Sequence, residues 1–261
     1  MLGNVYNGVK TKTGIIIRLE KQSSVKPENL TREICDKIKE LIPVGHTSFI
    51  FEISDYDFEK SFVPRDAEIE RMNYFIEDLG FRIGFYLKTG NYFSTTDPQT
   101  EEKAKSEIKL IGGMMDLLKL PSVFESPVII HIGSAQGDRK RIMEKFCEFH
   151  NSLPWSVKNR LCVINDDKPS LFSVKDLLPG LTATNKIPIV FRSTSFPTNQ
   201  GSLTYKESLF LAASSWPKTT SPIIIYLPYG VTLTQEEMNP YGMDLDIVFD
   251  NSLPEPEKFN I

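Results

Sequence analysis

The chain has 261 residues, of which 40% are hydrophobic and 25% are charged, and it carries a formal net charge of −4. These values are typical of a soluble globular protein. They argue against binding of nucleic acid through the whole surface, although they leave a local basic groove open. No apolar stretch reaches membrane-spanning length, and the first residues lack the charged start and apolar run of a signal peptide.

Short apolar runs alternate with amphipathic stretches along the chain. In chain order, eight runs predict buried parallel strands: Gly14–Leu19, Ser48–Ile53, Phe81–Leu87, Pro127–Ile132, Leu161–Asn165, Ile187–Arg192, Pro222–Leu227 and Leu245–Phe249. Helical spacing of apolar residues predicts helices between them: Asn29–Leu41, Asp66–Leu79, Glu101–Leu118, Asp138–Phe149, Ser173–Leu181 and Tyr205–Ala213.

The alternation of eight strands with helices predicts a single (β/α)₈ barrel, or TIM barrel, over residues 1–261, with residues 251–261 as a surface tail. An open doubly wound sheet is the alternative, but no glycine-rich phosphate-binding motif follows an early strand. The two longest segments without a clear helix or strand pattern are Gly90–Thr100 and Ser193–Thr204, and each follows a predicted strand. We therefore expect both at the carboxyl face, where barrel sites are built.

Three cysteines, Cys35, Cys147 and Cys162, have no spacing typical of a metal site. Their odd number, together with the missing signal peptide, indicates free thiols in a reducing, intracellular compartment. We interpret Cys147 and Cys162 as small buried apolar groups.

A series of motifs in the second half of the chain carries a family resemblance. It begins with Val128-Ile-Ile-His131-Ile-Gly133 and Gly137-Asp138-Arg139, continues through Leu153-Pro154 and Asn165-Asp166-Asp167, and ends with Ser173-Val-Lys-Asp-Leu-Leu-Pro179 and Ile187-Pro-Ile-Val-Phe191. In this order and spacing, the stretch from Pro127 to Val190 resembles the UV-damage endonuclease family. The resemblance implies a (β/α)₈ barrel that nicks DNA 5′ of a damaged site with divalent metals held by His, Glu and Asp at the strand ends.

Most of the metal ligands that the resemblance implies are replaced in this chain. The fourth-strand histidine is kept as His131, but the third-strand histidine falls at Tyr86 and the fifth-strand glutamate at Ile164. The sixth-strand aspartate falls at Arg192, and the seventh-strand lysine and histidine fall near Ile224 and Tyr226. The eighth-strand histidine falls around Asp244–Asp246, where Asp246 keeps the aspartate that follows it. The whole sequence holds three histidines, His46, His131 and His150, so a site with four or five imidazoles cannot be assembled.

The residues at these positions have alternative interpretations. His131 is a surviving ligand or a buried histidine hydrogen-bonded at a strand end. Asn165, Asp166 and Asp167 bind one cation with His131, or they shape the exit from the strand as turn formers and helix caps.

Arg192 forms an internal ion pair in place of the metal cluster, holds a phosphate, or reaches solvent. Tyr86 and Tyr226 stack on bases or fill the space left by lost metals.

Three hypotheses for function follow. The preferred one is a catalytically degenerate UV-damage-endonuclease-like barrel with a binding or structural role, for example as a component of a larger assembly, with a protein partner and no metal or other cofactor. The second is a metal-dependent DNA repair endonuclease. Its Mn or Zn site would have fewer ligands than the family's and would be formed by His131, Asp166, Asp167 and either Glu52 or Asp246. The third is a DNA-binding module without catalysis. The sequence does not predict whether the chain is an enzyme or what its oligomeric state is.

Overall fold

A computed structural model describes residues 4–6, 9–19, 30–53, 64–87, 93–95, 97–133, 138–166, 168–181, 186–220, 222–228 and 244–250. For residues 4–6, 9–13, 224–228 and 250 it describes the backbone alone.

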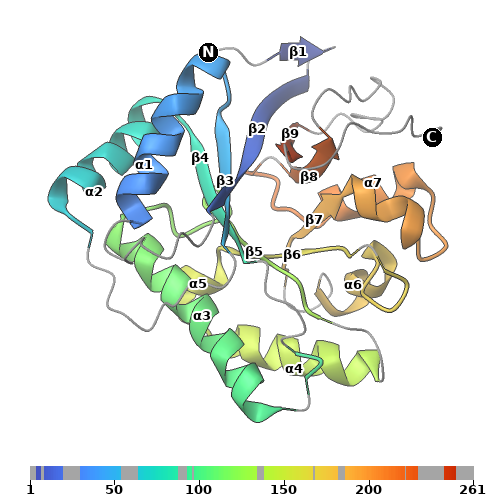
Figure 1. The fold of residues 1–261 in the computed structure, drawn as a ribbon. Helices are drawn as coiled ribbons and strands as arrows, with labels where there is room; N and C mark the ends of the chain where they lie inside the picture. The colour runs from blue at the N-terminus through green and yellow to red at the C-terminus, as the bar shows by residue number, and fades with distance from the viewer. Residues whose placement is uncertain are drawn as a thin grey trace.

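A parallel barrel forms the centre of the molecule (Figure 1). Its strands are β2 (Val9–Leu19), β3 (Ser48–Ile53), β4 (Arg82–Leu87), β5 (Val128–Ile130), β6 (Leu161–Ile164), β7 (Ile189–Arg192), β8 (Ile223–Pro228) and β9 (Leu245–Asp250). Each strand pairs in parallel with the next, and β9 closes the barrel by pairing with β2. The predicted (β/α)₈ barrel is therefore confirmed. A further strand, β1 (Asn4–Tyr6), pairs antiparallel with the start of β2.

Helices surround the barrel on the outside (Figure 1). They are α1 (Leu30–Leu41), α2 (Asp66–Asn73), α3 (Pro98–Leu117), α4 (Arg139–Ser152), the short α5 (Trp155–Lys158), α6 (Val174–Leu181) and α7 (Tyr205–Ser214). Shorter helical segments follow α1, α2 and β7: η2 (Ile42–Val44), η3 (Tyr74–Asp78) and η4 (Ser193–Thr198). In the described part of the chain, no helix is long and apolar enough to cross a membrane.

The structure differs from the sequence-based elements mainly at helix ends. Helix α3 begins at Pro98, inside the predicted loop Gly90–Thr100, because Pro98 occupies the first turn and the Asp97 side chain accepts hydrogen bonds from the Gln99 and Thr100 amides. Segment Ser193–Thr204, which shows no clear helix or strand pattern in the sequence, contains η4. Neither α5 nor β1 was predicted.

Buried side chains form an outer and an inner layer. The outer layer lies between the strands and the helices. The inner layer fills the barrel and consists of Ile16, Ile50, Tyr86, Ile129, Cys162, Ile164, Val190, Trp216, Ile223 and Val248. Because strand side chains alternate between the two faces, residues two positions beyond an inner-layer residue also face the interior. This alternation determines which polar side chains reach the two ends of the barrel.

Candidate functional site at the barrel mouth

Polar side chains follow the inner layer at the carboxyl ends of six neighbouring strands. They are Arg18, Glu52, Tyr86, His131, Asp166 and Arg192, on or just after β2 to β7. Glu52 lies opposite Arg18 on one side and Tyr86 on the other in the strand ladders. The carboxyl end is where barrel enzymes place their active sites, so this ring is the candidate site.

Three members of the ring form a continuous chain of contacts. The Tyr86 hydroxyl makes a short hydrogen bond with Nε2 of His131. On the other side of the imidazole, Nδ1 lies 2.8 Å from Asp166 Oδ1, which is within ion-pair distance but without the alignment of a hydrogen bond. Tyr86 is fully buried, and His131 and Asp166 are 9% and 6% exposed. The structure thus brings together three of the residues that were predicted to form the site.

Glu52 forms an ion pair with a residue that the sequence analysis missed. The Arg18 Nε lies 3.3 Å from Glu52 Oε1, and the Glu52 side chain is 4% exposed against 40% for Arg18. Arg18 is penultimate in its strand and two residues beyond Ile16, so the alternation of side chains could have identified it.

Asn165 joins the exits of two adjacent strands. Its side-chain amide donates to the Arg192 carbonyl at 3.2 Å, and its Oδ1 accepts from the Arg192 amide at 2.6 Å. These two bonds continue the β6–β7 ladder beyond its last strand pair. They involve the Arg192 backbone, so the predicted internal ion pair of its guanidinium stays a prediction.

Asp246 does not belong to this ring, which corrects its expected grouping with His131. It is the second residue of β9 and therefore lies at the amino end of the barrel. There its Oδ2 accepts hydrogen bonds from Arg82 Nη1 at 2.8 Å and from the Ser48 hydroxyl at 2.6 Å. Arg82 and Ser48 are the first residues of β4 and β3, so these three side chains close the opposite end of the barrel.

Two predicted site residues cannot be placed relative to the others. Asp167 lies outside the described residues, and Tyr226 belongs to β8, where only the backbone is described. Ile164, at the position where the resemblance implies a glutamate, is an apolar member of the inner layer.

Two of the three histidines lie away from the mouth. His46 precedes β3 at the amino end of the barrel, and His150 lies in the last turn of α4. Burial lowers the pKa of both imidazoles. His131 is therefore the single histidine that the fold brings to the mouth.

The fit of a metal cluster can be tested on His131 itself. In protein metal sites, a histidine that binds the metal through one ring nitrogen commonly has a carboxylate beside the other. Asp166 lies beside Nδ1 as such a carboxylate would, but the Tyr86 hydroxyl occupies Nε2, where the metal would bind. Among the described residues, no three His, Cys, Asp or Glu side chains come together as a metal site. The residues described here do not fit a multinuclear metal centre.

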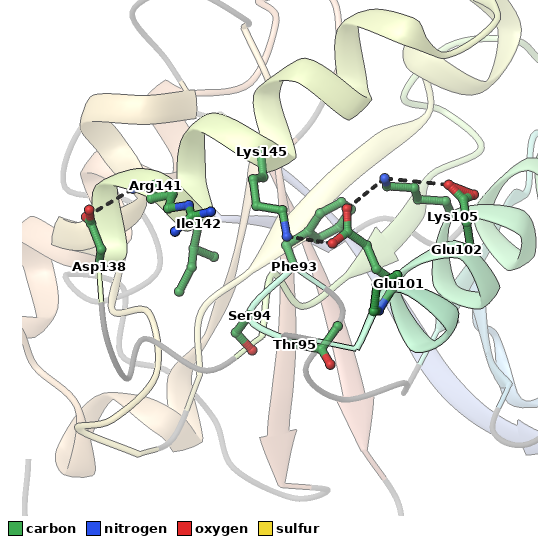
Figure 2. Close-up of a pocket in the computed structure, with 11 residues that line it drawn as sticks. Phe93, Ser94, Thr95, Glu101, Glu102, Lys105, Asp138, Arg141, Ile142 and Lys145 are labelled. Carbon is green, nitrogen blue, oxygen red and sulfur yellow. Dashed lines mark hydrogen bonds and ion pairs between the residues drawn. The ribbon is translucent and has the colours of Figure 1, made fainter.

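A cleft of about 570 Å³ lies outside the barrel, between residues 93–95 and the first turns of α3 and α4 (Figure 2). Glu101 of α3 binds both Lys105 and Lys145, which reaches across from α4. Burial raises the pKa of Glu101, but the two ammonium groups outweigh it and hold that pKa below its usual range. Glu101 also raises the pKa of Lys105. The charges at this end of the cleft therefore satisfy one another.

The chain is similar to proteins named as UV DNA damage endonucleases. Residues 40–238 match the family described as UV-endonuclease UvdE. The UV DNA damage endonuclease of Clostridium perfringens is 27% identical over 182 residues, which are 69% of this chain and 41% of that protein. The Bacillus pumilus protein of the same name is 25% identical over 194 residues, which are 74% of this chain and 58% of that protein. The matches therefore span about half the length of these two relatives.

Solved structures share the fold. The crystal structure of SacUVDE aligns with a TM-score of 0.67 at 19% identity and covers 92% of both chains. Endonuclease IV from Thermus thermophilus aligns with a TM-score of 0.62 at 13% identity, covering 94% of this chain and 93% of that one.

Proposed function

Because the chain belongs to the UV-endonuclease UvdE family, we propose that it keeps the family barrel as a binding or structural component that has lost metal-dependent nuclease chemistry. The observation that supports the proposal most is the hydrogen bond between the Tyr86 hydroxyl and His131 Nε2. A phenol in this position replaces a metal ion with a neutral hydrogen-bonding group.

The chemistry of phosphodiester hydrolysis explains why this replacement matters. Divalent metals generate the hydroxide nucleophile and stabilise the phosphoryl oxygens, and they need several carboxylates and imidazoles that converge on one point. Here one imidazole and one carboxylate contact each other, and Glu52 pairs with Arg18. An arginine beside a carboxylate at the mouth repels a divalent cation that this carboxylate would otherwise attract.

The preferred partner in this proposal is another protein in an assembly, and the chain is proposed to need no cofactor. The relatives are named for action on DNA, so binding of DNA without cleavage is the alternative to be separated by experiment. A mononuclear Mn or Zn site at His131 and Asp166 is the remaining alternative, and it would require the Tyr86 hydroxyl to move away from Nε2.

Metal content and nicking activity together test the proposal. The purified chain is dialysed against Mn²⁺ and Zn²⁺, analysed for bound metal, and incubated with UV-irradiated plasmid DNA. We expect less than about a tenth of an equivalent of metal and no nicking above that of a metal-free control. The proposal would be overturned if the chain held one equivalent of metal tightly or nicked the DNA, and if that property were lost in His131→Ala but kept in His46→Ala. His46 is the matched control because it lies at the other end of the barrel. Retarded migration of intact DNA would instead favour the DNA-binding alternative.

A further inference from the structure

The outer face of α3 carries an exposed apolar line. Leu110 and Leu117 are 44% and 51% exposed, and Ser106 and Gly113 on the same face are exposed as well. These four residues, called here the α3 seam, follow one another at intervals of four, three and four positions. This is the spacing that keeps side chains in line along a helix that packs against another helix.

Among the residues that the structure describes, none packs closely against Gly113, whereas Val157 packs against its neighbour Gly112. A Cβ on Gly112 would lie 2.3 Å from a Val157 methyl group, so α5 can pack against α3 only if residue 112 lacks a side chain. A Cβ on Gly113 would meet no described atom within 4 Å, and its backbone is ordinary helix. A glycine in the middle of a helix is unfavourable relative to alanine. A close approach from outside the subunit would account for it.

We propose that the α3 seam is the contact surface for a second copy of this chain, packed antiparallel against its own α3. One register pairs Leu110 with Gly113 of the second copy and Leu117 with Ser106 of the second copy, because both pairs of residue numbers have the same sum. Each large apolar side chain then lies opposite a small residue, in both directions. Such an interface is isologous, with a two-fold axis that passes between residues 111 and 112.

The charges beside the seam suit this register. Lys109 and Asp116 lie on the same flank of α3, seven positions apart and both exposed. In this register Lys109 faces position 114 of the second copy, two positions or about 3 Å along the helix from its Asp116, so opposite charges lie near each other on both sides of the two-fold axis. Asp116 is held in place by the buried Arg160 guanidinium and by the Ser156 hydroxyl at 2.7 Å. The seam is therefore complementary to itself, which is why a second copy is the partner that it fits.

Apolar area next to the seam adds to the surface. Trp155 of α5 is 68% exposed, and its neighbour Ser156 binds Asp116 beside Leu117. Tryptophan is over-represented among the residues that dominate interface energies. The contact lies on the outside of the barrel, so it is independent of the function proposed for the mouth.

Sedimentation equilibrium over roughly 1–200 µM protein measures self-association directly. We expect a concentration-dependent dimer in the parent chain and a monomer in Leu110→Glu. Val44→Glu, an equally charged change at a residue that is 57% exposed elsewhere, should remain dimeric. Gly113→Leu should fold with an unchanged or higher melting temperature, because a Cβ at this position meets no described atom within 4 Å and leucine favours the helix, yet it should be monomeric. A parent chain that is monomeric throughout, or a Gly113→Leu dimer of parental affinity, would overturn the proposal.

Engineered cysteines test the register itself. In the proposed dimer, Ser106 of one copy faces Leu117 of the other, whereas like residues lie roughly 16 Å apart along the helices. Under mild oxidant, a mixture of Ser106→Cys and Leu117→Cys proteins should form disulfide-linked dimers, and neither protein alone should do so. The parent chain is the control for its own cysteines, of which Cys35 and Cys162 are buried. Cross-linking of Ser106→Cys with itself to the same extent would rule out this register.

Discussion

His150 connects the end of α4 to α5 and makes stability depend on pH. Burial, reinforced by the Lys158 ammonium, lowers the pKa of its imidazole to about 4 from 6.5. Between these two pH values the unfolded chain binds the proton and the folded chain does not. The stabilisation is therefore complete above pH 6.5 and is lost as the pH falls towards 4.

The size of this effect can be isolated with one variant. We expect the free energy of unfolding of the parent to fall by at most roughly 3 kcal/mol between pH 6.5 and pH 4 because of this group. Urea denaturation at several pH values measures it. In His150→Gln, the free energy of unfolding should fall less steeply with decreasing pH. The contributions of the other titrating groups are the same in both proteins and cancel in the comparison. Equal slopes in the parent and the variant would contradict the assignment to His150.

Several residues of the mouth could be predicted because each places a polar or charged side chain at the end of an apolar strand. His131 and Asp166 follow buried strands and belong to the motifs that carry the family resemblance, and Glu52 is the penultimate residue of β3. The contact between Tyr86 and His131 could not be predicted, since it joins residues 45 positions apart and depends on two side-chain orientations. Arg160 was missed as a buried residue. Its guanidinium is fully buried because it binds the carbonyls of Gly112, Leu120 and Pro121, which a sequence pattern does not reveal.

At the scale of elements, α3 offers a matched pair of glycines for a stability test. Gly112→Ala should destabilise the fold by about 1–3 kcal/mol, because the new methyl group would overlap Val157 and displace α5. Gly113→Ala should stabilise it by about 0.5–1 kcal/mol, because the methyl group has space and the helix becomes more favourable. Urea denaturation of dilute protein measures both. If both variants raised the free energy of unfolding, the contact between α3 and α5 would not be what requires a glycine at position 112.

The barrel strands were predictable because buried parallel strands are continuous apolar runs, and each of the eight predicted runs overlaps an observed strand. Helix α5 was not, since four residues are too few to show a helical period and its burial rests on Val157 alone. Helix α3 begins at Pro98 and not at Glu101, where the apolar spacing predicts its start, because Asp97 and Pro98 together form a helix-start signal. The periodicity of apolar residues thus predicts that a helix or strand exists, whereas the capping residues determine where a helix begins.

At the scale of the whole molecule, the interior of the barrel is apolar in the middle and charged at both ends. At the carboxyl end, the Arg18 side chain of the Arg18–Glu52 pair is 40% exposed. At the amino end, Arg82 and Asp246 are 4% and 0% exposed and join β4 to β9 across the interior. A buried ion pair gains little over an apolar pair, but loss of one partner leaves the other charge buried without compensation. The two ends should therefore respond differently to the loss of a charge.

A double-mutant cycle at the amino end tests this contrast. Asp246→Leu and Arg82→Met should each lower the free energy of unfolding by about 3–5 kcal/mol, because each removes the opposite charge that this pair supplies to a buried group. The double variant should lose clearly less than the sum, with a coupling of about 2 kcal/mol or more, since no charge remains uncompensated. Glu52→Gln should cost no more than about 1 kcal/mol, because the charge that it leaves behind is that of Arg18, whose side chain is 40% exposed and reaches solvent. Urea denaturation of the parent and these variants decides the matter: losses that simply add would mean that Arg82 and Asp246 are each stabilised by other groups, and that the amino end is not held closed by this pair.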